Sequence, residues 1–363
     1  MPANSLVPTT SDVVAFPTDR NLAMLEHAHA PEAILAAAPR SRSRGFLITL
    51  ALATLIPLIG VPLVLGIAMA YGTGLVPGSL ALAAITGPMH VAATGFFYFD
   101  RDFRPVIGEN RLSCLWALLL LPVTILAVGL SATAVIGPWA YLSIFCFHNT
   151  WLFYHYQRQN FGLASFISTH AGCGRLPPRV NTALNVAALG AIVSLVGTPG
   201  FYPNTAGLMT PDAYAVLRTA GRVIYVLSVV MLIGVFRSEP RLRKSALLTG
   251  ALILGVAFFL PAVVFRSAAM AFLGPATAHG AQYILMMSVV SGRSSRGWLG
   301  LLTMCAVGAT VGLVINSMTT WPAILLATGI VEVHFLIDAK VWRLREQRQR
   351  KIMNDRFDFL LAA

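Results

Sequence analysis

Ten apolar runs of about 20 residues follow one another along the chain, and they constrain its fold more than any other feature. A run of this length spans the hydrocarbon core of a bilayer as an α-helix. Inside a bilayer the backbone has to satisfy its own hydrogen bonds, so a chain of this kind folds as a bundle of helices. We therefore predict an all-α, polytopic transmembrane helical bundle with spans at roughly 45–70, 75–98, 114–136, 138–157, 181–198, 221–236, 246–264, 269–291, 298–317 and 321–341.

The amount and placement of charge support a membrane protein. Only 11% of the 363 residues are charged, against about 25% in a soluble domain. The net charge of +12 could suggest nucleic acid, but the basic residues lie in short clusters between the apolar runs. Of the 26 Lys and Arg residues, only Arg218, Arg222 and Arg266 fall on the side opposite the N-terminus. Since basic residues concentrate in cytoplasmic segments, we expect both termini in the cytoplasm and no nucleic-acid partner.

Three regions follow from this pattern. Residues 1–44 are polar and rich in Ala, Pro and Ser, which predicts a disordered cytoplasmic tail; residues 45–341 form the bundle, and residues 342–363 form a basic cytoplasmic tail. No apolar run opens the chain, so we expect no cleavable signal peptide. The location expected is a bacterial-type inner (plasma) membrane, and the sequence leaves the oligomeric state open.

Five histidines lie inside the apolar runs, where ionisable side chains are costly and usually face the bundle interior or a cavity. Four of them, His90, His148, His279 and His334, lie on separate runs that share one direction. Each precedes a cytoplasmic arginine by 9–14 residues, which places it about 14–21 Å from that arginine along a helix. We therefore predict that these four bind a metal at one level in the membrane. His155 shares the helix face of His148 but lies about 10 Å nearer the cytoplasm, so it either supports a ligand, binds a second metal or lines the access to the site.

Polar side chains accompany these histidines. Asp338 follows His334 by four residues and Tyr283 follows His279 by four, so each pair shares a helix face. Glu332 precedes His334 by two residues and points elsewhere. A metal-bound imidazole normally donates its other N–H to a polar partner. Tyr283, Asp338 and Glu332 are therefore the candidate catalytic residues, although a single membrane histidine can also serve only to hydrogen-bond a neighbouring helix.

The donor types restrict the metal. Imidazole suits iron, copper and zinc. Carboxylate-rich di-iron bundles need several Glu residues, and only Glu332 and Asp338 lie within the runs. The His boxes of membrane desaturases are absent, as are the paired histidines of bis-histidine haem proteins. We expect Fe²⁺ in a mononuclear non-haem site, with Cu or Zn as alternatives and haem less favoured.

The element Gly87-Pro88-Met89-His90, together with single histidines in later apolar runs, resembles the bacterial Brp/Blh family of membrane carotene-cleaving dioxygenases. That resemblance implies iron ligands at His90, His148, His279 and His334. The chain departs from the family pattern at Val91, where glycine is expected, and in lacking a His-x-x-x-His spacing.

The function expected is an iron-dependent oxygenase that takes O2 and a lipophilic small molecule entering from the membrane lipids. Two alternatives remain at the level of sequence. The histidines, Glu332 and Asp338 could relay protons in a proton-coupled membrane transporter. They could also specify helix packing in a structural subunit.

Overall fold

The computed structural model describes residues 40–72, 75–199, 207–292, 295–317 and 320–361. Most of the predicted N-terminal tail lies outside these residues. Every regular element in the described part is a helix. In chain order they are α1 (Arg40–Tyr71), α2 (Leu75–Ala93), α3 (Phe96–Phe99), α4 (Arg104–Glu109), α5 (Arg111–Ile136), α6 (Pro138–His170), α7 (Pro178–Val196), α8 (Pro211–Ser238), η3 (Pro240–Arg243), α9 (Ala246–Ala257), α10 (Leu260–Val264), α11 (Ala268–Ser291), α12 (Ser295–Ser317), α13 (Trp321–Val341), α14 (Gln347–Arg356) and α15 (Asp358–Leu361).

Six stretches of helix in the described residues are long and apolar enough to cross a membrane. They are Arg42–Tyr71, Cys114–Ile136, Pro178–Val196, Pro211–Ser238, Ala246–Val264 and Arg296–Val314. Their length and composition mark a multi-pass, all-helical membrane protein, as the sequence predicts. The four long helices outside this set, α2, α6, α11 and α13, are those that carry the five histidines.

Helix α6 is much longer than the predicted run at 138–157. It begins after Gly137, whose φ of 55° makes the tight turn from α5 that the Gly-Pro pair predicts. It then continues past Arg158 to His170 over 33 residues. The added turns are helical because Leu163, Ala164, Phe166 and Ile167 are buried in the bundle core. The connection to α7 therefore begins only after His170.

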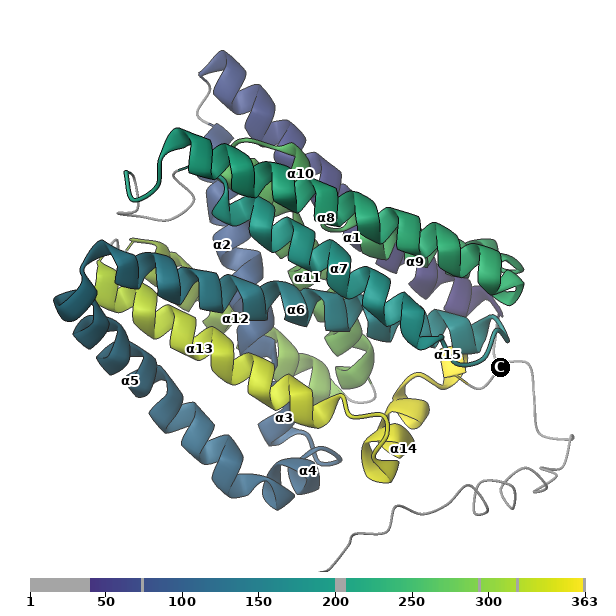
Figure 1. Ribbon diagram of the computed structural model, residues 1–363. Coiled ribbons are helices and arrows are strands. Elements are labelled where there is room, and N and C mark those ends of the chain that lie inside the picture. The colour runs from purple at the N-terminus through teal and green to yellow at the C-terminus, as the bar shows by residue number, and fades with distance from the viewer. Residues whose placement is uncertain (1–39, 73–74, 200–206, 293–294, 318–319, 362–363) are drawn as a thin grey trace, which may run out of the picture. The chain divides into compact units, whose positions relative to one another are not determined.

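The helices that carry the histidines meet inside the bundle (Figure 1). α2 packs along α11 and α12, α13 packs along α5, and α13 also contacts both α2 and α6. α1 lies along α11, and α7 lies along α8. As a result α2, α6, α11 and α13, which are far apart in the sequence, come together.

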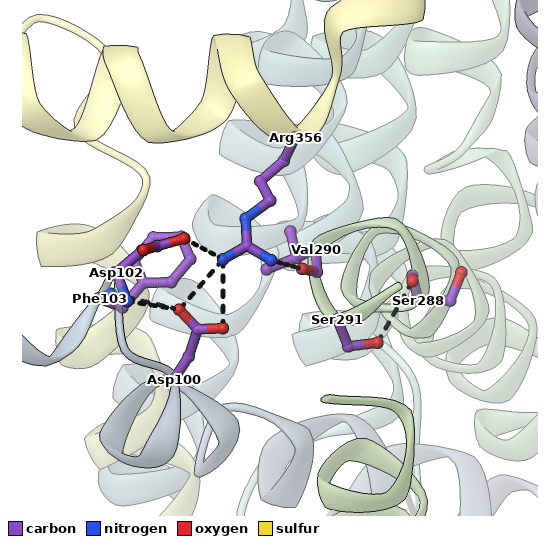
Figure 2. Close-up of polar contacts among 7 residues, drawn as sticks. All are labelled: Asp100, Asp102, Phe103, Ser288, Val290, Ser291 and Arg356. Atoms are coloured by element: carbon purple, nitrogen blue, oxygen red, sulfur yellow. Dashed lines mark hydrogen bonds and ion pairs between the residues drawn. The ribbon is translucent and has the colours of Figure 1, made fainter. Parts of the chain in front are cut away.

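The C-terminal segment folds back onto the bundle. Phe357 is fully buried, with its ring centroid 6.2 Å from that of Phe46 on α1 and 5.5 Å from that of Phe166 on α6. The neighbouring Arg356 is only 7% exposed and donates to the carbonyl oxygen of Val290 at 2.6 Å (Figure 2). The segment predicted only as a basic tail is thus an integrated part of the bundle.

Arg356 also joins this segment to the turn that follows α3. Its guanidinium forms ion pairs with Asp100 at 3.3 Å and with Asp102 (Figure 2). The Asp100 side chain is 11% exposed, whereas that of Asp102 is 53% exposed. The pair with Asp100 is therefore the one shielded from water.

Replacing Arg356 by methionine keeps the aliphatic bulk but leaves Asp100 without its cation. We expect Arg356→Met to destabilise the protein by about 2 kcal/mol, since an uncompensated, largely buried charge is costly. The measurement is the thermal unfolding midpoint in detergent. Arg350→Met changes an exposed arginine of the same helix and serves as the matched control; equal midpoints for the two variants would contradict the prediction.

Candidate metal centre

Four imidazoles from four helices form one buried cluster. The His90 ring centroid lies 4.7 Å from that of His279 and 4.9 Å from that of His334. The His155 ring centroid lies 5.0 Å from that of His279 and 5.1 Å from that of His334. His279 is fully buried and His334 is 2% exposed. The cluster therefore lies in the interior, where water cannot satisfy its nitrogens.

His90 presents an unprotonated nitrogen to the cluster. Its Nδ1 lies 3.3 Å from the carbonyl oxygen of Thr86, one turn earlier in α2. A carbonyl only accepts hydrogen bonds, so this contact places the ring proton on Nδ1. The buried Nε2 then carries a lone pair, and it has no hydrogen-bond partner.

His334 is held by a chain of hydroxyl groups that ends on a carboxylate. The Tyr283 hydroxyl donates to Asp338 Oδ1 at 2.7 Å, and the Thr94 hydroxyl lies 2.9 Å from the Tyr283 hydroxyl. Thr94 Oγ1 in turn contacts His334 Nδ1 at 2.5 Å. An ionised Asp338 can only accept, so each hydroxyl donates toward it and His334 Nδ1 carries the proton. His334 Nε2, which also lacks a hydrogen-bond partner, is left with a lone pair directed away from this chain.

These nitrogens lie close enough together to hold a metal ion. Ligand nitrogens of His90, His279 and His334 lie within 4.8 Å of one another, as do ligand atoms of His155, His334 and Asp338. Both nitrogens of His279 and the Nε2 of His155 are buried without a hydrogen-bond partner. Such orphaned polar atoms are rare in folded proteins and call for an explanation. A bound cation would satisfy several of them at once, and imidazole is a common ligand of iron, copper and zinc.

The carboxyl group of Asp338 also faces this cluster, and it would bring negative charge to a bound cation. Its Oδ2 lies 3.7 Å from His334 Nε2 and 3.9 Å from His155 Nε2. Four neutral imidazoles alone would leave a divalent cation uncompensated in a medium of low dielectric constant. Asp338 therefore both orients His334 through Tyr283 and Thr94 and offsets part of a cation's charge.

His148 lies apart from the cluster. Its Nδ1 donates to Glu332 Oε1 at 2.9 Å, and the two side chains are 14% and 8% exposed. Of the five predicted histidines, the structure therefore brings His155, and not His148, together with His90, His279 and His334. α6 continues 12 residues beyond Arg158 to His170, so the spacing from that arginine does not give the distance of either histidine from the end of the helix. His155 is near the middle of α6, and His148 lies seven residues closer to its start.

Two further features hold α11 in place beside the site. Gly280 lies so close to α2 that a Cβ there would be 2.9 Å from the Thr86 carbonyl oxygen and 3.3 Å from His90 Nδ1. The Gln282 amide donates to the Thr54 hydroxyl of α1 at 2.8 Å and accepts from Gln159 of α6 at 2.8 Å. Thr54, Gln159 and Gly280 are site residues that were not predicted from the sequence. The available signal was that Gln159 follows His155 by four residues and so shares its face.

Comparison of this chain with known proteins gave no match. No protein-family model matches the chain, and neither a curated protein nor a solved structure does. The class of this site therefore rests on the geometry above.

Thr94 connects two buried polar groups, which makes its hydroxyl testable without metal. Thr94→Val keeps the shape of the side chain but leaves His334 Nδ1 and the Tyr283 hydroxyl without a shared partner. We expect a loss of about 1–3 kcal/mol in stability, because unpaired buried polar groups cost that much. Thermal unfolding of metal-free protein measures it, with Thr94→Ser, which keeps the hydroxyl, as the control. A valine variant as stable as the serine variant would refute the hydroxyl chain.

Proposed function

We propose that this chain is an integral-membrane, non-haem metal oxidoreductase that holds its metal with His90, His155, His279 and His334. The observation that carries the proposal is the convergence of these four buried imidazoles, each with at least one nitrogen that lacks a hydrogen-bond partner. Asp338, Tyr283 and Thr94 orient His334 and supply a negative charge. Packing alone does not account for so many unpaired nitrogens in one place.

Iron is the metal that we favour, with copper or zinc as alternatives. A site made of imidazole and carboxylate donors is typical of non-haem iron. Bound iron would supply the redox chemistry with O2, so the proposed activity is that of an oxygenase. The resemblance of Gly87-Pro88-Met89-His90 to the Brp/Blh dioxygenases agrees with this activity. In this chain, however, the proposed ligand from α6 is His155 rather than His148.

A lipophilic substrate reaches this site from the bilayer along α6 in our proposal. Phe147, Trp151 and Tyr154 form an exposed aromatic stripe on α6, being 64%, 40% and 45% exposed. His148 and His155 are each slightly exposed, at 14% and 13% of the side chain. An apolar molecule in the membrane would thus meet the aromatic stripe first and then the histidines. The His148–Glu332 pair lines this path and is positioned to exchange protons with it.

We further propose ten membrane spans, with both termini in the cytoplasm of a bacterial-type cell and the protein in its inner membrane. In addition to the six helical stretches named above, α2, α6, α11 and α13 have 19, 33, 24 and 21 residues. About 20 residues suffice to cross the hydrocarbon core. Polar residues in these four helices gather on the shared site, which is the usual arrangement for polar residues within a membrane.

Two matched histidine substitutions test the metal assignment. His279→Leu removes a proposed ligand, and His148→Leu removes a histidine outside the cluster. We expect the wild type and His148→Leu to purify with stoichiometric iron by elemental mass spectrometry. His279→Leu should retain at most about one tenth of that iron. Even the replacement of a residue that only supports a metal ligand commonly lowers metal affinity about tenfold.

Other outcomes would favour other functions. Equal metal content in both variants would contradict the proposed ligand set. A metal-free protein that moves protons across proteoliposome membranes would favour the transporter, for which the His148–Glu332 pair is the relevant feature.

The number of spans is tested by labelling introduced cysteines in intact cells. Glu109, in the connection between α2 and α5, and Asp212, at the start of α8, both have exposed side chains. With α2 crossing the membrane, Glu109→Cys is cytoplasmic and Asp212→Cys is external. A membrane-impermeant thiol reagent should therefore label only Asp212→Cys until the cells are lysed. Labelling of Glu109→Cys in intact cells would mean that α2 is not a span.

A further inference from the structure

A cluster of three arginines lies beside the N-terminal half of α8, away from Arg237 in the last turn of that helix. Arg218 and Arg222 are on α8, and Arg266 follows α10. These are the three residues that depart from the charge asymmetry of the chain. Their contacts place them around one stretch of backbone, residues 263–266.

Arg218 is buried without a counter-ion. It is 8% exposed and donates to the Thr198 hydroxyl at 3.2 Å and to the carbonyl oxygens of Val264 and Phe265 at 3.1 and 2.8 Å. All three acceptors are uncharged, and its Nε is buried with no partner. A cation shielded from water needs compensating negative charge, which none of these groups supplies.

Arg222 and Arg266 add two more positive charges beside it. Arg222 donates from Nε to the carbonyl oxygen of Val263 at 3.3 Å, and both side chains are exposed. Among the described residues, no carboxylate forms an ion pair with any of the three arginines. The sequence contains only two acidic residues between Glu109 and Glu332, namely Asp212 and Glu239. The positive charge is thus not offset within this part of the protein.

The position of the cluster along α8 indicates that the lipid bilayer is the source of a compensating anion. Arg218 and Arg237 are nineteen residues apart on α8, which is about 28 Å along the helix. That length is close to the hydrocarbon thickness of about 30 Å. With Arg237 at one membrane surface, Arg218 lies near the opposite boundary of the hydrocarbon core, from which long arginine side chains reach the lipid headgroups of that leaflet.

We propose that Arg218, Arg222 and Arg266 form a binding site for the phosphate of an anionic phospholipid in that leaflet. Arginine presents several N–H groups in a plane and suits phosphate oxygens better than lysine does. Arg218 supplies fixed charge while its own donors hold the end of α10. The exposed Arg222 and Arg266 make the contacts with the lipid.

Lipid binding to the purified full chain in a neutral detergent tests this site. Phosphatidylglycerol is titrated onto delipidated protein and bound lipid is measured by native mass spectrometry, with phosphatidylcholine and inorganic phosphate in parallel. We expect the wild type to bind phosphatidylglycerol most tightly. Arg222→Gln combined with Arg266→Gln should weaken that binding at least about tenfold, because two charge-assisted contacts are lost.

The matched control combines Arg243→Gln and Lys244→Gln, which removes two exposed basic residues near the other end of α8 and should change the affinity less than about twofold. Equal losses in the two double variants would overturn the proposal, as would equal binding of the two lipids. Inorganic phosphate that binds as tightly as phosphatidylglycerol would also overturn the lipid assignment. If the double variant cannot be purified, the single variant Arg222→Gln, which changes an exposed side chain, replaces it, and unchanged binding of phosphatidylglycerol would overturn the proposal.

Discussion

The need to satisfy imidazole nitrogens inside a water-free bundle is the constraint on which the rest of this structure depends. Four rings from α2, α6, α11 and α13 meet in the interior, where His90, His279 and His334 are buried and His155 is only slightly exposed. Hydrogen bonds to Thr86 and Thr94 account for one nitrogen each of His90 and His334. The nitrogens that face the cluster remain without partners. Unpaired polar groups of this kind are costly when buried, and in our proposal a bound metal ion completes this donor set.

The surrounding residues hold the rings so that they can act together. Gly280 permits the close approach of α11 to α2, and Gln282 connects α11 to α1 and α6. Asp338 fixes the protonated nitrogen of His334 through two hydroxyl groups. These contacts use rigid helices rather than loops, which favours a site with little freedom to rearrange. This rigidity is one reason why we propose redox chemistry at a fixed metal rather than a transport cycle, which requires alternating exposure to the two sides.

Two buried arginines, Arg356 and Arg218, differ in how their positive charge is compensated. At the end where the C-terminal segment docks, Arg356 is neutralised by Asp100 and Asp102 and also holds a backbone carbonyl. At the other end, Arg218 contacts only neutral oxygens. The first arrangement completes itself within the protein, whereas the second is completed in our proposal by the membrane. The same residue type thus secures the fold in one place and binds lipid in the other.

The sequence by itself determined the helical class, the approximate positions of the long helices and that His90, His148, His155, His279 and His334 lie inside them. Hydrophobic run length and the cost of burying charge are local properties, so they can be evaluated without coordinates. It also indicated Asp338 and Tyr283, because a four-residue spacing places side chains on one helix face. The tertiary structure decided that His155 joins the cluster while His148 pairs with Glu332. It decided as well that the C-terminal segment packs into the bundle. These outcomes depend on where α6 ends and on how helices distant in the sequence approach one another, and spacing along a single helix contains no information about either.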